Sequence, residues 1–240
     1  MVFLIFLFFV SSCASQVTGS LKVDGQADLQ IYAALEPRMT ALIGGLAAAS
    51  GSAQPGAPIL DGPAITASMS SAPGIASVSL KNIAPAAIEG PVKISKVSDF
   101  LAPAGTHKTK FIIFEQGAAA SLKGGSSTGG RCAINLSLDS GPDILALISP
   151  EVSAYLAALM APIATGEALS KAEYLLLVRS IYGRGIADEI AQASIRAFID
   201  FPGSVKSVQG GTFSGRRAVF TIPLADVLVL ETPLSYEVVW

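Results

Sequence analysis

The sequence predicts an α+β fold: a curved antiparallel sheet of about eight strands, with a helical insert packed on one face. Two observations lead to this class. Several segments alternate apolar and polar residues, which is typical of antiparallel strands with one buried and one solvated face. Residues 141–193 instead repeat apolar side chains with the period of a helix. A block of helices set apart from the strands distinguishes α+β from the alternating α/β pattern.

Composition narrows the class of protein. The chain has 240 residues, of which 51% are hydrophobic and 14% are charged, and its formal net charge is -2. This hydropathy excludes a disordered chain, and the lack of a basic excess argues against a nucleic-acid partner. After a short leader and tether, residues 21–240 are long enough for a single domain with its own core.

Strands are predicted on both sides of the helical insert. In residues 21–31, Leu21, Leu29 and Ile31 share one face, while Lys22 and Asp28 share the other. Further strands are expected at residues 75–83, 88–97, 110–116, 131–139, 195–201, 205–213, 216–222 and 236–240. Helices outside the insert are expected at residues 37–49 and 63–71.

The helical insert contains several signals for helix ends. Residues 140–143 have the spacing of a capping box, and Ser149 before a proline is a second candidate N-cap. Residues 170–173 form a complete capping box, and Gly183 is a natural helix terminator. These signals divide the insert into consecutive short helices.

An apolar stripe runs along the insert. Its members are Tyr155, Leu156, Leu159, Met160 and Ile163, with Leu175 and Val178 on the helix opposite. The segment 144–164 carries one charged residue, Glu151. Three interpretations stay open: a membrane span, a helix buried in the core, and the wall of a ligand cavity or a membrane-contacting face. Pro150 and Pro162 favour two packed helices over a span.

The first ten residues are wholly apolar and too short to span a bilayer. They fit the hydrophobic region of a secretory signal peptide. The next residues, Val10-Ser11-Ser12-Cys13, resemble the bacterial lipobox, in which an aliphatic residue and two small residues precede a cysteine. The resemblance implies that residues 1–12 are removed, that Cys13 carries the lipid, and that residues 13–20 form a tether.

One feature departs from the lipobox pattern. A signal peptide begins with positive residues, yet the first Lys or Arg of this chain is Lys22. Two explanations stay open: coding sequence upstream of Met1 supplies the basic residues, or the signal is atypical. An ordinary cleaved signal and an uncleaved anchor are the alternatives to lipidation.

Cys132 is the second of the two cysteines. With Cys13 acylated, Cys132 has no partner for an intramolecular disulfide. It alternates with polar residues and shares a strand face with Ile134 and Leu136. We therefore expect a buried cysteine that acts as a small hydrophobic residue rather than as a nucleophile.

Residues with catalytic chemistry are sparse. His107 is the one histidine, so no site can be built from several histidines, and we expect it to be solvated. Residues 125–129 match Gly-x-Ser-x-Gly, but they lack the strand-to-helix context of a nucleophile elbow and no histidine follows. We expect no catalytic residues, no metal site and no cofactor. An enzyme whose site is assembled from scattered carboxylates remains a third hypothesis.

Residues 149–183, together with the ending at Trp240, resemble a group of treponemal (spirochaete) membrane-associated lipoproteins. The resemblance implies a lipid-anchored protein of the cell envelope. No functional motif defines the group, so no binding residues carry over to this chain.

The expected function is that of a non-enzymatic lipoprotein anchored in the bacterial envelope, facing the periplasm at the outer membrane. We expect it to bind lipid or another apolar ligand between sheet and helices, with the seven stripe residues as its lining. Ala14 directly after the cysteine is compatible with delivery to the outer membrane. The alternative is a structural or assembly lipoprotein that binds a protein partner of the envelope and has no ligand cavity.

Overall fold

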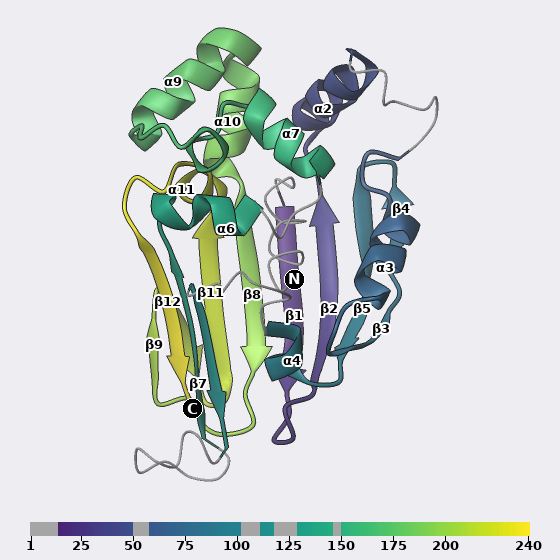
Figure 1. Ribbon diagram of the computed structural model, residues 1–240, viewed down its shortest axis with the longest axis vertical. Coiled ribbons are helices and arrows are strands. Elements are labelled where there is room, and N and C mark those ends of the chain that lie inside the picture. Colours follow the sequence, from purple (N-terminus) through teal and green to yellow (C-terminus); the bar gives the residue numbers. More distant parts are fainter. Residues whose placement is uncertain (1–13, 50–57, 102–110, 118–128, 146–149) are drawn as a thin grey trace.

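A computed structural model describes residues 14–49, 58–101, 111–117, 129–145 and 150–240. In this part of the chain, a large sheet forms one layer and a smaller sheet packs on part of it, while most of the helices lie across one end (Figure 1). Neither sheet closes on itself. The predicted α+β class with a largely antiparallel sheet is confirmed.

Eight strands form the large sheet, in the order β10-β11-β8-β1-β2-β5-β3, with β4 also paired to β5. Their bounds are β1 Ala14–Leu21, β2 Ala27–Ala34, β3 Ile75–Val78, β4 Lys81–Ala84, β5 Ala87–Ile94, β8 Ser194–Asp200, β10 Gly211–Ser214 and β11 Arg217–Pro223. Paired strands run antiparallel except β1 and β8, which run parallel.

A second sheet of four strands covers part of the inner face of the large sheet, and the sequence did not predict it. Its order is β6-β7-β12-β9, with bounds β6 Ile112–Gln116, β7 Gly130–Leu136, β9 Ser207–Gln209 and β12 Leu234–Val239. The expected strand at 205–213 breaks at Gly210, whose positive φ of 74° lets the chain change direction. The two halves of that segment therefore join different sheets.

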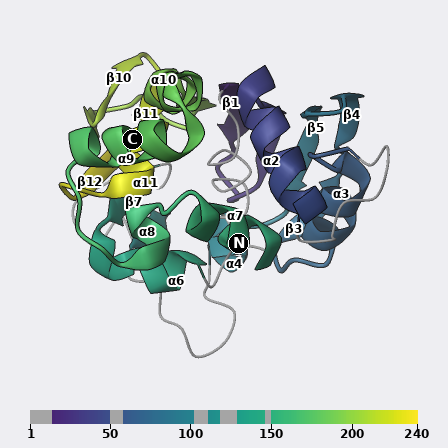
Figure 2. The same cartoon turned by 90° about the horizontal axis from the view of Figure 1, so that it is seen from above.

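Most helices gather at the end of the sheets where β1 begins and β2 ends (Figures 1 and 2). The helices at this end are α2 Pro37–Ala49, α6 Gly141–Leu145, α7 Pro150–Ala158, α8 Pro162–Thr165, α9 Lys171–Tyr182, α10 Arg184–Gln192 and α11 Leu224–Val229. A 3-10 turn at Leu138–Ser140 leads into α6. Elsewhere, α3 Gly62–Ser70 lies beside β3 and β4, and α4 Val97–Leu101 lies near the β1–β2 turn. Among the residues that the structure describes, no helix is long and apolar enough to cross a membrane.

The start of the described chain differs from the prediction. Residues 14–20, expected as a tether, form strand β1 in the middle of the large sheet. The single strand expected at 21–31 is instead a tight turn followed by β2. Gly25 takes a φ of +83°, and the backbone N–H of Lys22 donates to the carbonyl of Gln26 at 2.8 Å. Asp24-Gly25 is a hairpin signal that outweighs the continuing apolar alternation.

Helices α6 to α10 lie within residues 141–193, and their details differ from the prediction. The apolar stripe does not lie on one helix, because the chain leaves α7 after Ala158 and Met160 takes a φ of +52° before Pro162 starts α8. Ser140 does not cap a helix: it closes the preceding 3-10 turn by accepting from the N–H of Ser137. The second expected N-cap, Ser149, lies outside the described residues.

The cap of α9 agrees with the sequence. Ser170 Oγ accepts from the backbone N–H of Glu173 at 3.2 Å, and Glu173 Oε2 accepts from the N–H of Ser170 at 2.8 Å. Gly183 ends the helix with a φ of +89°. Both ends of α9 therefore follow from local sequence signals.

Candidate apolar binding site

A cavity of about 250 Å³ lies between the two sheets. On the large sheet its wall is formed by inward-facing side chains of β1, β2, β5, β8 and β11, among them Val17, Leu29 and Ile195. On the small sheet it is formed by β6, β7 and β12, among them Ile134 and Val238. The alternation of apolar and polar residues along each strand places these side chains on the inner face.

Short segments at the edge of the cavity supply aromatic side chains. Phe100 from α4 and Phe114 from β6 line it, as does Phe201, which directly follows β8. Phe201 packs against Trp240, with 4.7 Å between ring centroids, and Phe114 lies 6.2 Å from the same indole. Trp240 is 1% exposed, so it supports the cavity wall from behind rather than lining it.

Polar groups are few in this cavity. Among the described lining residues, Ser20, Cys132 and Tyr236 carry the polar side-chain atoms, and no lining residue is charged. Burial raises the pKa of Tyr236 above its usual value, with a smaller contribution from the negative charge of Asp226. All three side chains are therefore neutral at neutral pH. Such a lining favours an apolar guest over an ion.

Cys132 faces inward, as the sequence predicts, and is half-buried. It lies on β7, lines the cavity and packs against the hydrophobic core. Its desolvation raises the pKa of the thiol to about 12, and the charge of Glu237 adds to the shift. A thiol with that pKa is protonated at neutral pH, so it acts as a small apolar group and not as a nucleophile.

The seven residues expected to line a ligand site lie elsewhere. Leu156, Leu159, Ile163 and Val178 are buried in the packing of the helical end, and Tyr155 and Leu175 are half-buried there. Met160 is 39% exposed. None of the seven is among the residues that line the inter-sheet cavity. The lining instead comes from strands, whose alternation was visible in the sequence but whose partner sheet was not.

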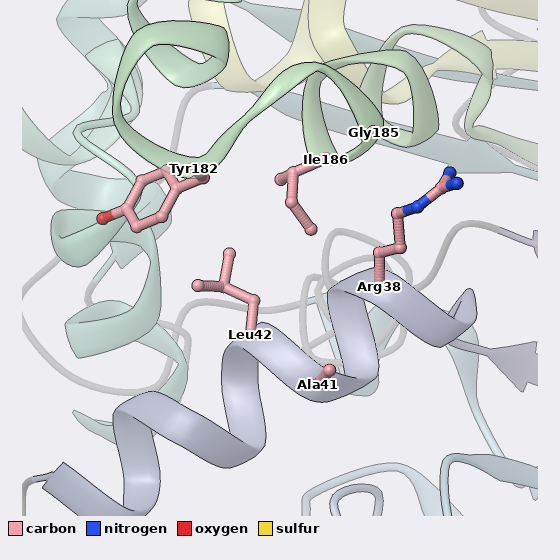
Figure 3. Close-up of a pocket in the computed structure, with 6 residues that line it drawn as sticks. All are labelled: Arg38, Ala41, Leu42, Tyr182, Gly185 and Ile186. Carbon is pink, nitrogen blue, oxygen red and sulfur yellow. The ribbon is translucent and has the colours of Figure 1, made fainter.

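A second depression lies outside the sheets, between α2 and the junction of α9 with α10 (Figure 3). We call it the Arg38 groove. Its volume is about 460 Å³, and its lining residues are Arg38, Ala41 and Leu42 from α2, with Tyr182, Gly185 and Ile186 opposite. Tyr182 is held by a hydrogen bond from its hydroxyl to the carbonyl of Ala158.

Metal-ligating side chains do not cluster in the described residues. Within them, no three His, Cys, Asp or Glu side chains come together in a way that could hold a metal ion. Cys13, His107 and most of the Gly-x-Ser-x-Gly segment at 125–129 lie outside the described residues, as does the expected signal at 1–12. Their assignments stay predictions from the sequence.

Comparisons with known proteins give little further information. No protein-family model and no curated protein matches the sequence. Among solved structures, the chain is similar to the NMR structure of the folded domain of LppM from Mycobacterium tuberculosis. The identity is 10% and the TM-score is 0.37, with 94% of this chain and 86% of that chain covered. A likeness of this size carries no argument about function, which rests on the geometry above.

Proposed function

We propose that this protein is a non-enzymatic lipoprotein of the bacterial envelope that binds a lipid or another apolar molecule between its two sheets. The observation that carries the ligand class is the inter-sheet cavity, because none of its described lining residues is charged. A charged or strongly polar guest would lose its hydration there without replacement. An aliphatic chain would gain about 25 cal/mol for each Å² of apolar surface buried.

The size of the cavity limits the ligand. Its volume of about 250 Å³ is below the roughly 300–1,000 Å³ of sites that enclose drug-sized ligands. We therefore propose one acyl chain, or part of one, as the guest. The polar end of such a lipid stays outside, since the lining offers it only neutral groups.

The anchor is proposed from the sequence. Val10 to Cys13 resemble the lipobox, and acyl chains on Cys13 would hold the protein to a membrane. We propose that the domain faces the periplasm and that the outer membrane is its location. A protein partner in the envelope is the alternative function, and the ligand experiment below separates the two.

A fluorescent fatty acid, cis-parinaric acid, tests the cavity directly. Trp240 is the one tryptophan of the chain, and it packs against two rings of the cavity wall. A probe bound in the cavity should therefore quench Trp240 by energy transfer. Ala197 lines the cavity from the middle of β8, so Ala197→Leu fills part of it. This variant should reduce binding of the probe at least several-fold.

Ala76→Leu is the matched control. Ala76 is exposed on β3, so this substitution adds the same side chain away from the cavity. It should bind the probe as the unaltered chain does. Equal binding by Ala197→Leu and the unaltered chain would show that the probe sits elsewhere. If the probe does not quench Trp240 and the chain co-purifies with no lipid, the structural lipoprotein would be favoured.

The anchor has its own experiment. Cells expressing the full chain are fed a palmitate analogue that can be tagged, and the protein is then isolated. Cys13→Ser should abolish the label and release the protein from membranes, whereas Cys132→Ser should keep both. Retention of the label in Cys13→Ser would overturn the lipobox assignment.

A further inference from the structure

The chain enters the fold at its helical end. Ala14 is the first described residue, and it pairs with Ala34 at the end of β2 and with Ser194 at the start of β8. Ala34 is followed closely by α2, and Ser194 follows the C-cap residue of α10, Ala193. Seen from above, β1 lies between α2 and α10 (Figure 2). Consecutive Cα atoms are about 3.8 Å apart, so a lipid on Cys13 would leave the protein beside these two helices.

The Arg38 groove lies between those same helices, and its two parts differ in chemistry. Leu42, Ile186 and the ring of Tyr182 line one part, while the guanidinium of Arg38 extends away from them at the other (Figure 3). A groove with an apolar part and a cationic part matches a molecule with an acyl chain and an anionic headgroup.

The charge of Arg38 is available to a ligand. Its side chain is 67% exposed, and its Nη1 lies 3.8 Å from Glu189 Oε1, which is a loose ion pair. Glu189 is itself engaged, because its carboxylate accepts from the backbone N–H groups of Arg38 and Met39 at 3.3 Å and 2.9 Å. The guanidinium makes no hydrogen bond within the described residues, so its donors can reach a phosphate.

Gly185 lets Arg38 take this position. A Cβ at residue 185 would lie 2.5 Å from Arg38 Cδ and 2.6 Å from its Nε. The arginine side chain therefore lies across the first turn of α10, where any larger residue would displace it. The contact offers a way to move the charge without removing it.

Exposed apolar side chains surround this end of the molecule. Leu176 and Ile181 on α9 are 62% and 49% exposed, and Met160 after α7 is 39% exposed. Apolar side chains next to cationic ones are typical of a surface that rests in the headgroup region of a bilayer.

We infer that the helical end faces the membrane and that the Arg38 groove binds an anionic phospholipid of the bilayer in which Cys13 is anchored. The inference rests on the proposed anchor. The lipid on Cys13 holds the groove close to the bilayer surface. Arg38 then contacts the phosphate, and Leu42 and Ile186 contact the upper part of an acyl chain.

The experiment uses the full chain isolated with its lipid and reconstituted into phosphatidylethanolamine vesicles, with or without phosphatidylglycerol. In a Cys132→Ala background, a fluorescent dye is attached at Ile181→Cys, at the helical end. The control position is Val23→Cys, which is 57% exposed in the β1–β2 turn at the opposite end. A nitroxide-bearing lipid should quench the dye at residue 181 and not at residue 23.

Two variants test the groove itself, and a third is their control. Arg38→Gln removes the charge, and Gly185→Ala displaces it. Arg184→Gln removes a neighbouring arginine that is 75% exposed and paired with Asp188 outside the groove lining. With phosphatidylglycerol present, Arg38→Gln should weaken docking of the helical end. The ratio of docked to undocked protein, measured from quenching at residue 181, should fall about fivefold, the effect expected of one basic residue at an anionic surface. Gly185→Ala should shift it in the same direction, and Arg184→Gln, which removes a charge already paired with Asp188, should shift it less than Arg38→Gln does.

The outcomes separate the two proposals. Protein that is washed off the vesicles lacks the anchor, which overturns the proposed lipoprotein and this inference together. If the protein stays bound but the dyes at residues 181 and 23 are quenched equally, the anchor is supported. The proposal that the helical end faces the membrane is then overturned. If quenching at residue 181 is the same with and without phosphatidylglycerol, and the same in Arg38→Gln as in the unaltered chain, the phospholipid site is overturned.

Discussion

The indole of Trp240 occupies the space that a side chain at Gly130 would need. A Cβ at Gly130 would overlap Cζ2 of that ring, and the two residues also exchange backbone hydrogen bonds of 3.1 Å and 3.0 Å. Phe201 and Phe114 pack on the same ring. The absence of a side chain at one residue of β7 therefore lets the tryptophan support the cavity wall.

Gly130→Ala should destabilise the protein by about 1–3 kcal/mol, because a methyl group there overpacks a buried site. Denaturant unfolding followed by the fluorescence of the one tryptophan measures the change. Gly45→Ala is the control, since a Cβ at Gly45 on α2 meets nothing within 4 Å. It should stabilise the protein by about 0.5–1 kcal/mol through helix propensity. Equal stability of the two variants would contradict the packing argument.

Glu189→Gln should lower the stability of the protein by about 1 kcal/mol. The Glu189 carboxylate is 12% exposed and accepts two N–H groups in the first turn of α2, where negative charge is favourable. Thermal unfolding measures the loss. Asp188→Asn, which removes a mostly exposed ion-pair partner of Arg184, should change stability by less than about 0.5 kcal/mol. A larger effect at Asp188 than at Glu189 would reverse this assignment.

Alkaline pH should destabilise the protein partly through Cys132. Its pKa is about 12 in the fold, above the ordinary value of 9.0, because burial disfavours the thiolate. The unfolded chain therefore releases the proton first, and stability is lost as pH rises from about 9 towards 12. Unfolding of Cys132→Ala over this range should show a shallower decline. Parallel pH profiles for the two proteins would show that the thiol does not contribute.

Acid should weaken the pairing of β7 with β12. The hydrogen bond from Arg131 Nη2 to Glu237 Oε2, at 2.7 Å, holds the pKa of that carboxyl below its usual value. A lowered pKa means that this stability is present above the unfolded pKa and is lost as pH falls through the folded one. Both side chains are partly exposed, so the loss should be within about 1 kcal/mol. Unfolding of Glu237→Gln at pH 6 and pH 3 should show a smaller difference than the unaltered chain.

Local signals account for the elements that the sequence predicted well. The bounds of α2 agree with the prediction, and both ends of α9 follow from the Ser170–Glu173 box and Gly183. The inward position of Cys132 follows from alternation along one strand. Each of these features depends on residues a few positions apart, so a single sequence contains the information.

Long-range pairing accounts for what was missed. Six of the seven stripe residues are buried or half-buried at the helical end, and periodicity cannot tell such packing from a ligand site. The strand β1 was mistaken for a tether because its position depends on β2 and on the distant β8. The cavity needs the inner faces of two sheets, whose strands are far apart in the chain.

By itself the sequence determined the α+β class, the two ends of α9 and the inward face of β7 at Cys132, because these follow from composition and short-range patterns. The tertiary structure alone decided which apolar side chains pack in the core, which line a cavity and which stay exposed. It brought β7 and β12 over β1 and β8 to form a cavity without charged lining, and it placed α2 against α10 to form the Arg38 groove. Both depend on contacts between segments that no local pattern relates.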